Sequence, residues 1–110
     1  MRYDTYPQTF TANGNGPAIG QTGDVGVTVD WLTGVSAGVV KVQTASGGDN
    51  ASALWVTEHT FTYASGSPTS ESAALQLRGK VMRINVSSLA GGNVTVTVDR
   101  YIGAIGGSSV

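Results

Sequence analysis

The chain has 110 residues, enough for one domain with a single modest core. Charged residues make up 12% of the sequence, about half the usual share of ~25%, and the formal net charge is -1 with no run of like charges. A chain with so little charge lacks the long-range electrostatic attraction on which binding to nucleic acids or to anionic membranes normally depends. The absence of cysteine excludes disulfide frameworks, thiolate zinc sites and cysteine nucleophiles.

Residues 1–24 are rich in Gly, Asn, Thr and Pro, and they predict an extended N-terminal arm with one short extended piece near residues 8–12. Three aromatic residues, Tyr3, Tyr6 and Phe10, fall in its first ten positions. Because large aromatic side chains are seldom left on a free tail, we expect them to dock on another surface, in this chain or in a partner. The segment lacks the apolar run of a signal peptide, so we expect synthesis in a cytoplasm without a leader.

A period of two begins at Val25 and predicts a strand over residues 25–31, followed by a second strand over residues 38–44. Residues 52–64 also alternate, but their apolar side chains change face, so we expect a bulge or a change of sheet near Thr57. After a loop, residues 73–78 predict another strand. The expected inward side chains are Val25, Val27, Val29, Trp31, Val40, Val42, Ala73, Leu75 and Leu77.

Residues 81–101 predict a hairpin with two inward rows of apolar side chains: Met82, Ile84 and Val86, then Val94, Val96 and Val98. Residues 103–110 have little to pack and predict a flexible tail. No window has a helical stripe, and turn clusters recur at short intervals. The chain is therefore expected to be all-β, a single antiparallel β-sandwich or jelly roll of about seven to eight strands over residues 25–102.

No catalytic, cofactor or metal set emerges from the reactive residues. His59 is the one histidine, and strand alternation should place it and Glu58 on opposite faces, which favours a structural or surface role. The carboxylates are scattered singly. Residues 47–52 lack the spacing of a calcium loop, and residues 14–16 lack the strand, loop and helix of a phosphate site. We therefore expect no cofactor and no enzymatic activity.

The outward strand positions are mostly uncharged hydrogen-bonding groups, which a partner can cover at small desolvation cost. They are Thr28, Asp30, Lys41, Gln43, Gln76, Asn85, Thr95 and Thr97. Basic residues gather near the final strands, at Arg78, Lys80, Arg83 and Arg100. The interface hypothesis names Arg2, Tyr3, Tyr6, Phe10, Arg83, Asn85, Thr95 and Thr97. The alternative is an ordinary Thr-rich β surface with solubilising charges.

Two stretches carry a resemblance to a known group of proteins: "LQLRGKVMRINVSSLAGGNVTVTVDR" (75–100) and "GVVKVQTASGGDNASALWV" (38–56). In their succession of strands and Gly-Gly-Asn or Asp-Asn turns, they resemble the small β-sandwich proteins of tailed-phage virions. These are head decoration (cement) proteins and related modules of tails and fibres. The resemblance implies a homo-oligomer, with a trimer favoured, that staples neighbouring subunits of the major capsid protein or other virion proteins. No family motif fixes individual binding residues.

The sequence thus favours a structural virion protein, and among these a capsid decoration protein. A tail, baseplate or fibre module is the first alternative. A carbohydrate-binding module is another, with Trp31, Trp55 and Tyr63 as a stacking platform, although both tryptophans are expected in the core. An enzyme is the remaining one. The expected location is the virion, with neither nucleic acid nor membrane as a partner.

Overall fold

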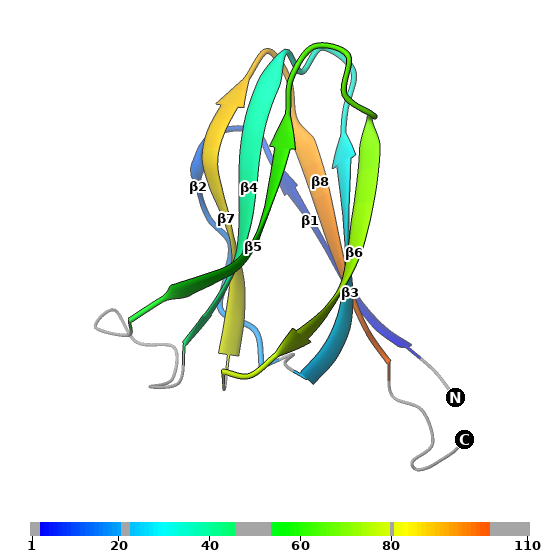
Figure 1. The fold of residues 1–110 in the computed structure, drawn as a ribbon. Helices are drawn as coiled ribbons and strands as arrows, with labels where there is room; N and C mark the ends of the chain where they lie inside the picture. The colour runs from blue at the N-terminus through cyan, green and yellow to red at the C-terminus, as the bar shows by residue number, and fades with distance from the viewer. Residues whose placement is uncertain (1–2, 21–22, 46–53, 80, 102–110) are drawn as a thin grey trace.

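The computed structural model describes residues 3–20, 23–45, 54–79 and 81–101, and over these residues the fold is all-β. Eight strands form two four-stranded antiparallel sheets that face each other (Figure 1). This confirms the predicted antiparallel sandwich of about eight strands.

Consecutive strands lie in different sheets except β4 and β5, which pair with each other in one sheet. Sheet A has the order β1-β8-β3-β6, and sheet B has the order β2-β7-β4-β5. The bounds are β1 Tyr3–Phe10, β2 Gly14–Asn15, β3 Gly23–Trp31, β4 Ala37–Ala45, β5 Val56–Tyr63, β6 Ser70–Leu77, β7 Val81–Ala90 and β8 Val94–Tyr101.

The pairing follows a single rule along the chain: the first strand pairs with the last, the second with the seventh, the third with the sixth and the fourth with the fifth. A chain that is folded back on itself at its middle and then rolled up gives this order, which is the eight-stranded jelly roll. Of the two architectures that the sequence left open, the strand order is that of the jelly roll.

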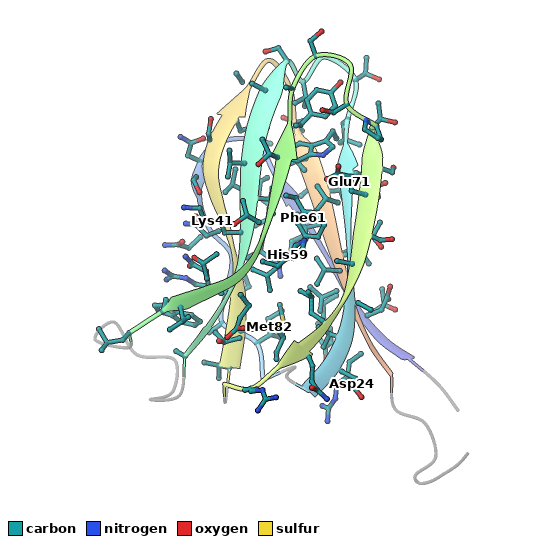
Figure 2. All side chains as sticks on the ribbon, in the orientation of Figure 1. Asp24, Lys41, His59, Phe61, Glu71 and Met82 are labelled. Atoms are coloured by element: carbon teal, nitrogen blue, oxygen red, sulfur yellow. The ribbon has the colours of Figure 1, made fainter. Side chains whose placement is uncertain are left out.

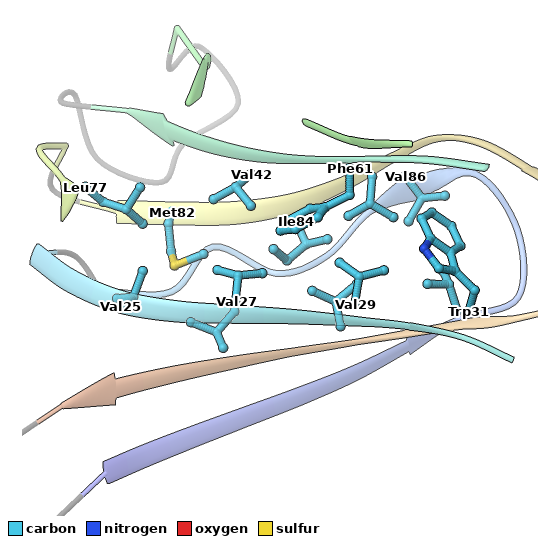
Figure 3. Packing of buried hydrophobic residues seen from close by; sticks show 14 of the residues in the cluster. Val25, Val27, Val29, Trp31, Val42, Phe61, Leu77, Met82, Ile84 and Val86 are labelled. Carbon is cyan, nitrogen blue, oxygen red and sulfur yellow. The ribbon is translucent and has the colours of Figure 1, made fainter. Parts of the chain in front are cut away.

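The core lies between the sheets because each strand points alternate side chains inward. Figure 3 shows the row of β3, from Val25 to Trp31, facing Met82, Ile84 and other apolar side chains of sheet B. The buried cluster contains Val25, Val27, Val29, Trp31, Val35, Val40, Val42, Phe61, Leu77, Met82, Ile84, Val86, Val94, Val96 and Val98. The predicted inward rows are therefore confirmed for the buried members, and Ala73 and Leu75 pack at the margin of the core.

The predicted N-terminal arm is wrong for the described part of residues 1–24. Residues 3–10 form β1, which pairs with β8 through eight consecutive residues as an edge strand of sheet A. Pro7 lies in this strand, and an edge strand is where a proline can be accommodated, because one side of its backbone needs no partner. The proposed boundary between arm and sandwich near residue 24 therefore disappears, and the predicted tail, residues 103–110, lies outside the described residues.

The predicted hairpin over residues 81–101 is also wrong. β7 pairs with β4 and β2 in sheet B, whereas β8 pairs with β1 and β3 in sheet A. The chain crosses from one sheet to the other at Gly91, whose φ of 91° suits glycine and whose added Cβ would lie 2.4 Å from the carbonyl oxygen of Gly34. A period of two has the same form whether two strands lie side by side or face each other across a core, so periodicity could not distinguish these arrangements.

The predicted irregularity near Thr57 is confirmed as a β-bulge. Along β4, Val42 pairs with His59 but the next residue, Gln43, pairs with Thr57, so Glu58 is the extra residue of β5. An extra residue reverses which positions face the core on either side of it. This explains how the apolar residues of the segment change face within one strand.

Candidate functional site

The predicted interface residues lie on opposite sides of the molecule. Arg83 and Asn85 occupy outward positions of β7 in sheet B, whereas Thr95 and Thr97 occupy outward positions of β8 in sheet A. They were grouped because the two strands were expected to form one hairpin. Since the strands belong to different sheets, the residues do not form one surface.

Two aromatic residues of β1, Tyr6 and Phe10, face inward. Tyr6 and Phe10 are half-buried and pack against the core of their own domain. They therefore dock on the core of their own chain, and their contact with another molecule stays a prediction. Arg2 and the side chain of Tyr3 lie outside the described residues.

A connected group of side chains gathers on the outer face of sheet B around Arg83. The guanidinium carbon of Arg83 lies 4.3 Å from the centre of the Trp55 ring, a distance typical of a cation–π contact. Its Nε donates a hydrogen bond of 2.8 Å to Oε1 of Gln43, and Nε2 of Gln43 donates one of 3.2 Å to Oγ1 of Thr57. Stacking on one side and the chain of hydrogen bonds on the other hold the guanidinium in one orientation.

A second hydrogen-bonded chain continues this surface toward β2. Nδ2 of Asn85 donates to Oδ1 of Asn15 at 2.6 Å, and Oγ of Ser87 donates to Oδ1 of Asn85 at 3.0 Å. Lys41 pairs with Asn85 across the β4–β7 ladder and points away from the core, whereas Phe61 points between the sheets (Figure 2). The described outward residues of sheet B thus carry two cations, Lys41 and Arg83, and neither Asp nor Glu; we call this surface the basic face.

The outer face of sheet A has the opposite charge. Its described outward residues include Asp24, Asp30 and Asp99, and they include neither Lys nor Arg. Ser70 donates to Asp30, Thr5 donates to Oδ1 of Asp99 at 2.7 Å, and Gln76 donates to Oδ1 of Asp24 at 3.4 Å. We call this surface the acidic face.

The acidic face is hollowed at the point where β3 and β6 have small outward residues. Gly26 pairs with Ala74 on one side and with Asp99 on the other. The resulting open hollow has a volume of about 720 Å³, and Asp24, Asp99 and Gln76 are among the residues that line it. A glycine within a strand often marks a site where another molecule approaches the backbone closely.

The aromatic platform that the sequence suggested does not form. Trp31 is 4% exposed and contacts the ring of Tyr63 in a tilted arrangement, with the ring centres 5.4 Å apart, which confirms its expected place in the core. Trp55 is half-buried on the opposite side of sheet B, so its expected place in the core is wrong. The bulge at Glu58 was the available signal, because it reverses the parity of the residues that precede it.

His59 is a packing residue at the margin of the core. Its ring meets the ring of Phe61 edge-on at 4.6 Å. Glu58 accepts a hydrogen bond of 2.8 Å from the hydroxyl of Thr44, an inward-facing side chain, so the expectation that strand alternation separates Glu58 from His59 is wrong at the bulge. No group of three His, Cys, Asp or Glu side chains that could hold a metal occurs among the described residues.

Residues 14–16 and 47–52 were considered as a phosphate site and a calcium loop. Gly14 and Asn15 form β2 and pair with β7, so residues 14–16 belong to a sheet edge. Residues 47–52, considered as a calcium loop, lie outside the described residues. No helix in the described part of the chain is long and apolar enough to cross a membrane.

Comparison of the chain with protein-family models, with curated proteins and with solved structures found no match.

Proposed function

We propose that the protein is a structural component of a tailed-phage virion, a capsid decoration protein that binds neighbouring subunits without catalysing a reaction. The observation that carries the proposal is the ordered patch on the basic face. Arg83 is stacked on Trp55 and held by Gln43 before any partner arrives, so binding orders few side chains. Arg and Trp are also the residue types most enriched among those that dominate interface energetics.

The architecture supports the same class of protein by analogy. Eight-stranded jelly rolls are recurrent in viral capsid proteins and in lectins. In a virion each contact can be weak, since many copies are held side by side and linked sites raise the effective affinity by about 10²–10⁴-fold. The Arg83–Trp55 cation–π pair forms within the chain and already holds the guanidinium in place, so each contact loses less side-chain entropy.

The proposal is tested by incubating the purified protein with phage particles that lack it and measuring cosedimentation. We expect wild-type protein to cosediment, Trp55→Ala and Arg83→Met to cosediment at least tenfold less, and Thr33→Ala, in an exposed turn, to behave as wild type. Immunogold labelling of complete virions then distinguishes the capsid from a tail, baseplate or fibre. Protein that neither sediments with particles nor labels virions would contradict the proposal.

A carbohydrate-binding module is the second candidate, and the surface position of Trp55 favours it. Aromatic rings with neighbouring hydrogen-bonding groups suit a sugar, and Gln43, Thr57 and Asn85 lie on the same face. Because Trp31 is buried, a glycan that binds here should quench the fluorescence of Trp55 alone. Glycan-dependent quenching in wild type and in Trp31→Phe, absent in Trp55→Phe, would favour this function over the virion role.

A further inference from the structure

The two outer faces of the sandwich carry opposite charges and belong to one molecule. We propose that the acidic face of one copy binds the basic face of a second copy, head to tail. The inference deepens the proposed function, because it names the partner of the Arg83 patch, and it rests on that patch being a contact surface. It does not depend on the partner being part of a virion.

Charge complementarity is the first observation in its favour. The acidic face has three aspartates and the basic face has Lys41 and Arg83, while the chain as a whole is nearly neutral, with a formal charge of -1. Two identical acidic faces would repel each other, and so would two identical basic faces. Only the pairing of unlike faces brings opposite charges together, so this arrangement is favoured over a two-fold symmetric contact.

The hollow in the acidic face has room for the side chains that the basic face presents. Its floor is formed by positions without bulky side chains, Gly26 and Ala74, and its rim carries the carboxylates of Asp24 and Asp99. The hydrogen bonds that these two carboxylates accept from described residues both go to Oδ1. A guanidinium can donate two parallel hydrogen bonds to a carboxylate, so Arg83 of a second copy suits this rim.

The faces also suit a contact between copies in geometry. Because the two faces lie on opposite sides of the sandwich, each bound pair still exposes one acidic and one basic face (Figure 1). Such contacts continue into longer assemblies or close into a ring.

The test uses analytical ultracentrifugation of the full chain without particles, at low salt (about 0.05 M NaCl) and at high salt (about 0.5 M). We expect wild type to self-associate at low salt and to dissociate at high salt, because screening weakens contacts between charges. Arg83→Glu and the double variant Asp24→Lys/Asp99→Lys should each associate at least tenfold more weakly. Gly26→Leu, which fills the hollow without changing charge, should do the same, and Thr33→Ala should match wild type.

Mixing the two charge-reversed proteins gives the decisive result. Arg83→Glu keeps an intact acidic face and Asp24→Lys/Asp99→Lys keeps an intact basic face, so an equimolar mixture should recover the association that each variant lacks alone. Circular dichroism checks that each variant is folded, and Gly26→Leu provides an independent variant should one of them fail to fold. A wild type that stays monomeric at low salt, or a mixture of folded variants that does not associate, would overturn the inference. Binding of the wild-type protein to particles is measured separately by cosedimentation. Its absence would contradict the proposed function without deciding whether the copies bind each other.

Discussion

The packing of Gly38 against Trp31 gives a stability prediction that can be worked from distances. Gly38 is buried in β4, and a Cβ added there would lie 2.4 Å from Cζ3 of Trp31, whereas ordinary contacts begin near 3.4 Å. The indole would have to retreat by about 1 Å, but the tilted ring of Tyr63 packs against it with its centre 5.4 Å away. Overpacking of this kind costs about 1–3 kcal/mol. We therefore expect Gly38→Ala to lower the free energy of unfolding by that amount.

The matched control is Gly26→Ala, which adds the same methyl group to the neighbouring sheet. Its Cβ would meet only the carbonyl oxygen of Asp99 at 4.0 Å, so we expect the protein to be unchanged or stabilised by about 0.4–1 kcal/mol. Urea unfolding at low protein concentration, followed by far-UV circular dichroism, measures both. In a Trp31→Phe background the smaller ring should reduce the cost of Gly38→Ala by half or more. A cost below about 0.5 kcal/mol, or an equal cost in both backgrounds, would refute the packing argument.

Three further predictions concern the edge strand, the core and the tryptophans. Deleting residues 1–10 removes β1 with half-buried Tyr6 and Phe10, so we expect a loss of about 3–6 kcal/mol in urea unfolding; a deletion variant as stable as wild type would restore the arm hypothesis. Ile84→Ala empties a fully buried position and should cost about 2–5 kcal/mol by the same assay, and a cost below 1 kcal/mol would contradict its central place. Iodide should quench the fluorescence of Trp31→Phe, which retains Trp55, far more than that of Trp55→Phe, and equal quenching would contradict the assigned positions.

The sequence could predict the fold class because burial has the same period as the apolar residues. The valines of β3, β4 and β8 alternate with polar residues, and every one of the alternate valines from Val94 to Val98 is fully buried. Strand pairing was less accessible, since it depends on contacts between residues far apart in sequence. The alternation of Met82, Ile84 and Val86 is the same whether β7 pairs with β8 or faces it across the core.

The sequence predicts which side chains of the candidate surface point outward, but not how they are brought together. Outward positions such as Lys41, Gln43 and Arg83 follow from alternation alone. Their assembly with Trp55 depends on the bulge at Glu58. The change of apolar face predicts a bulge near Thr57, but it does not say which face is the buried one on each side of the bulge. The opposite charge of the two faces could not be predicted without the strand order. Asp24 and Arg83 lie on different faces because their strands belong to different sheets.

The pairing of β1 with β8 sets the moment at which the protein can fold during its synthesis. Thr5 and Asp99 are 94 residues apart in the chain and hydrogen-bonded in the folded molecule. At about 5–20 residues per second, a ribosome needs roughly 5–20 s to add the residues between them. Tyr6 and Phe10 stay uncovered during that interval, because the strand that they cover has yet to emerge. We therefore expect the sandwich to be completed only after translation has passed β8.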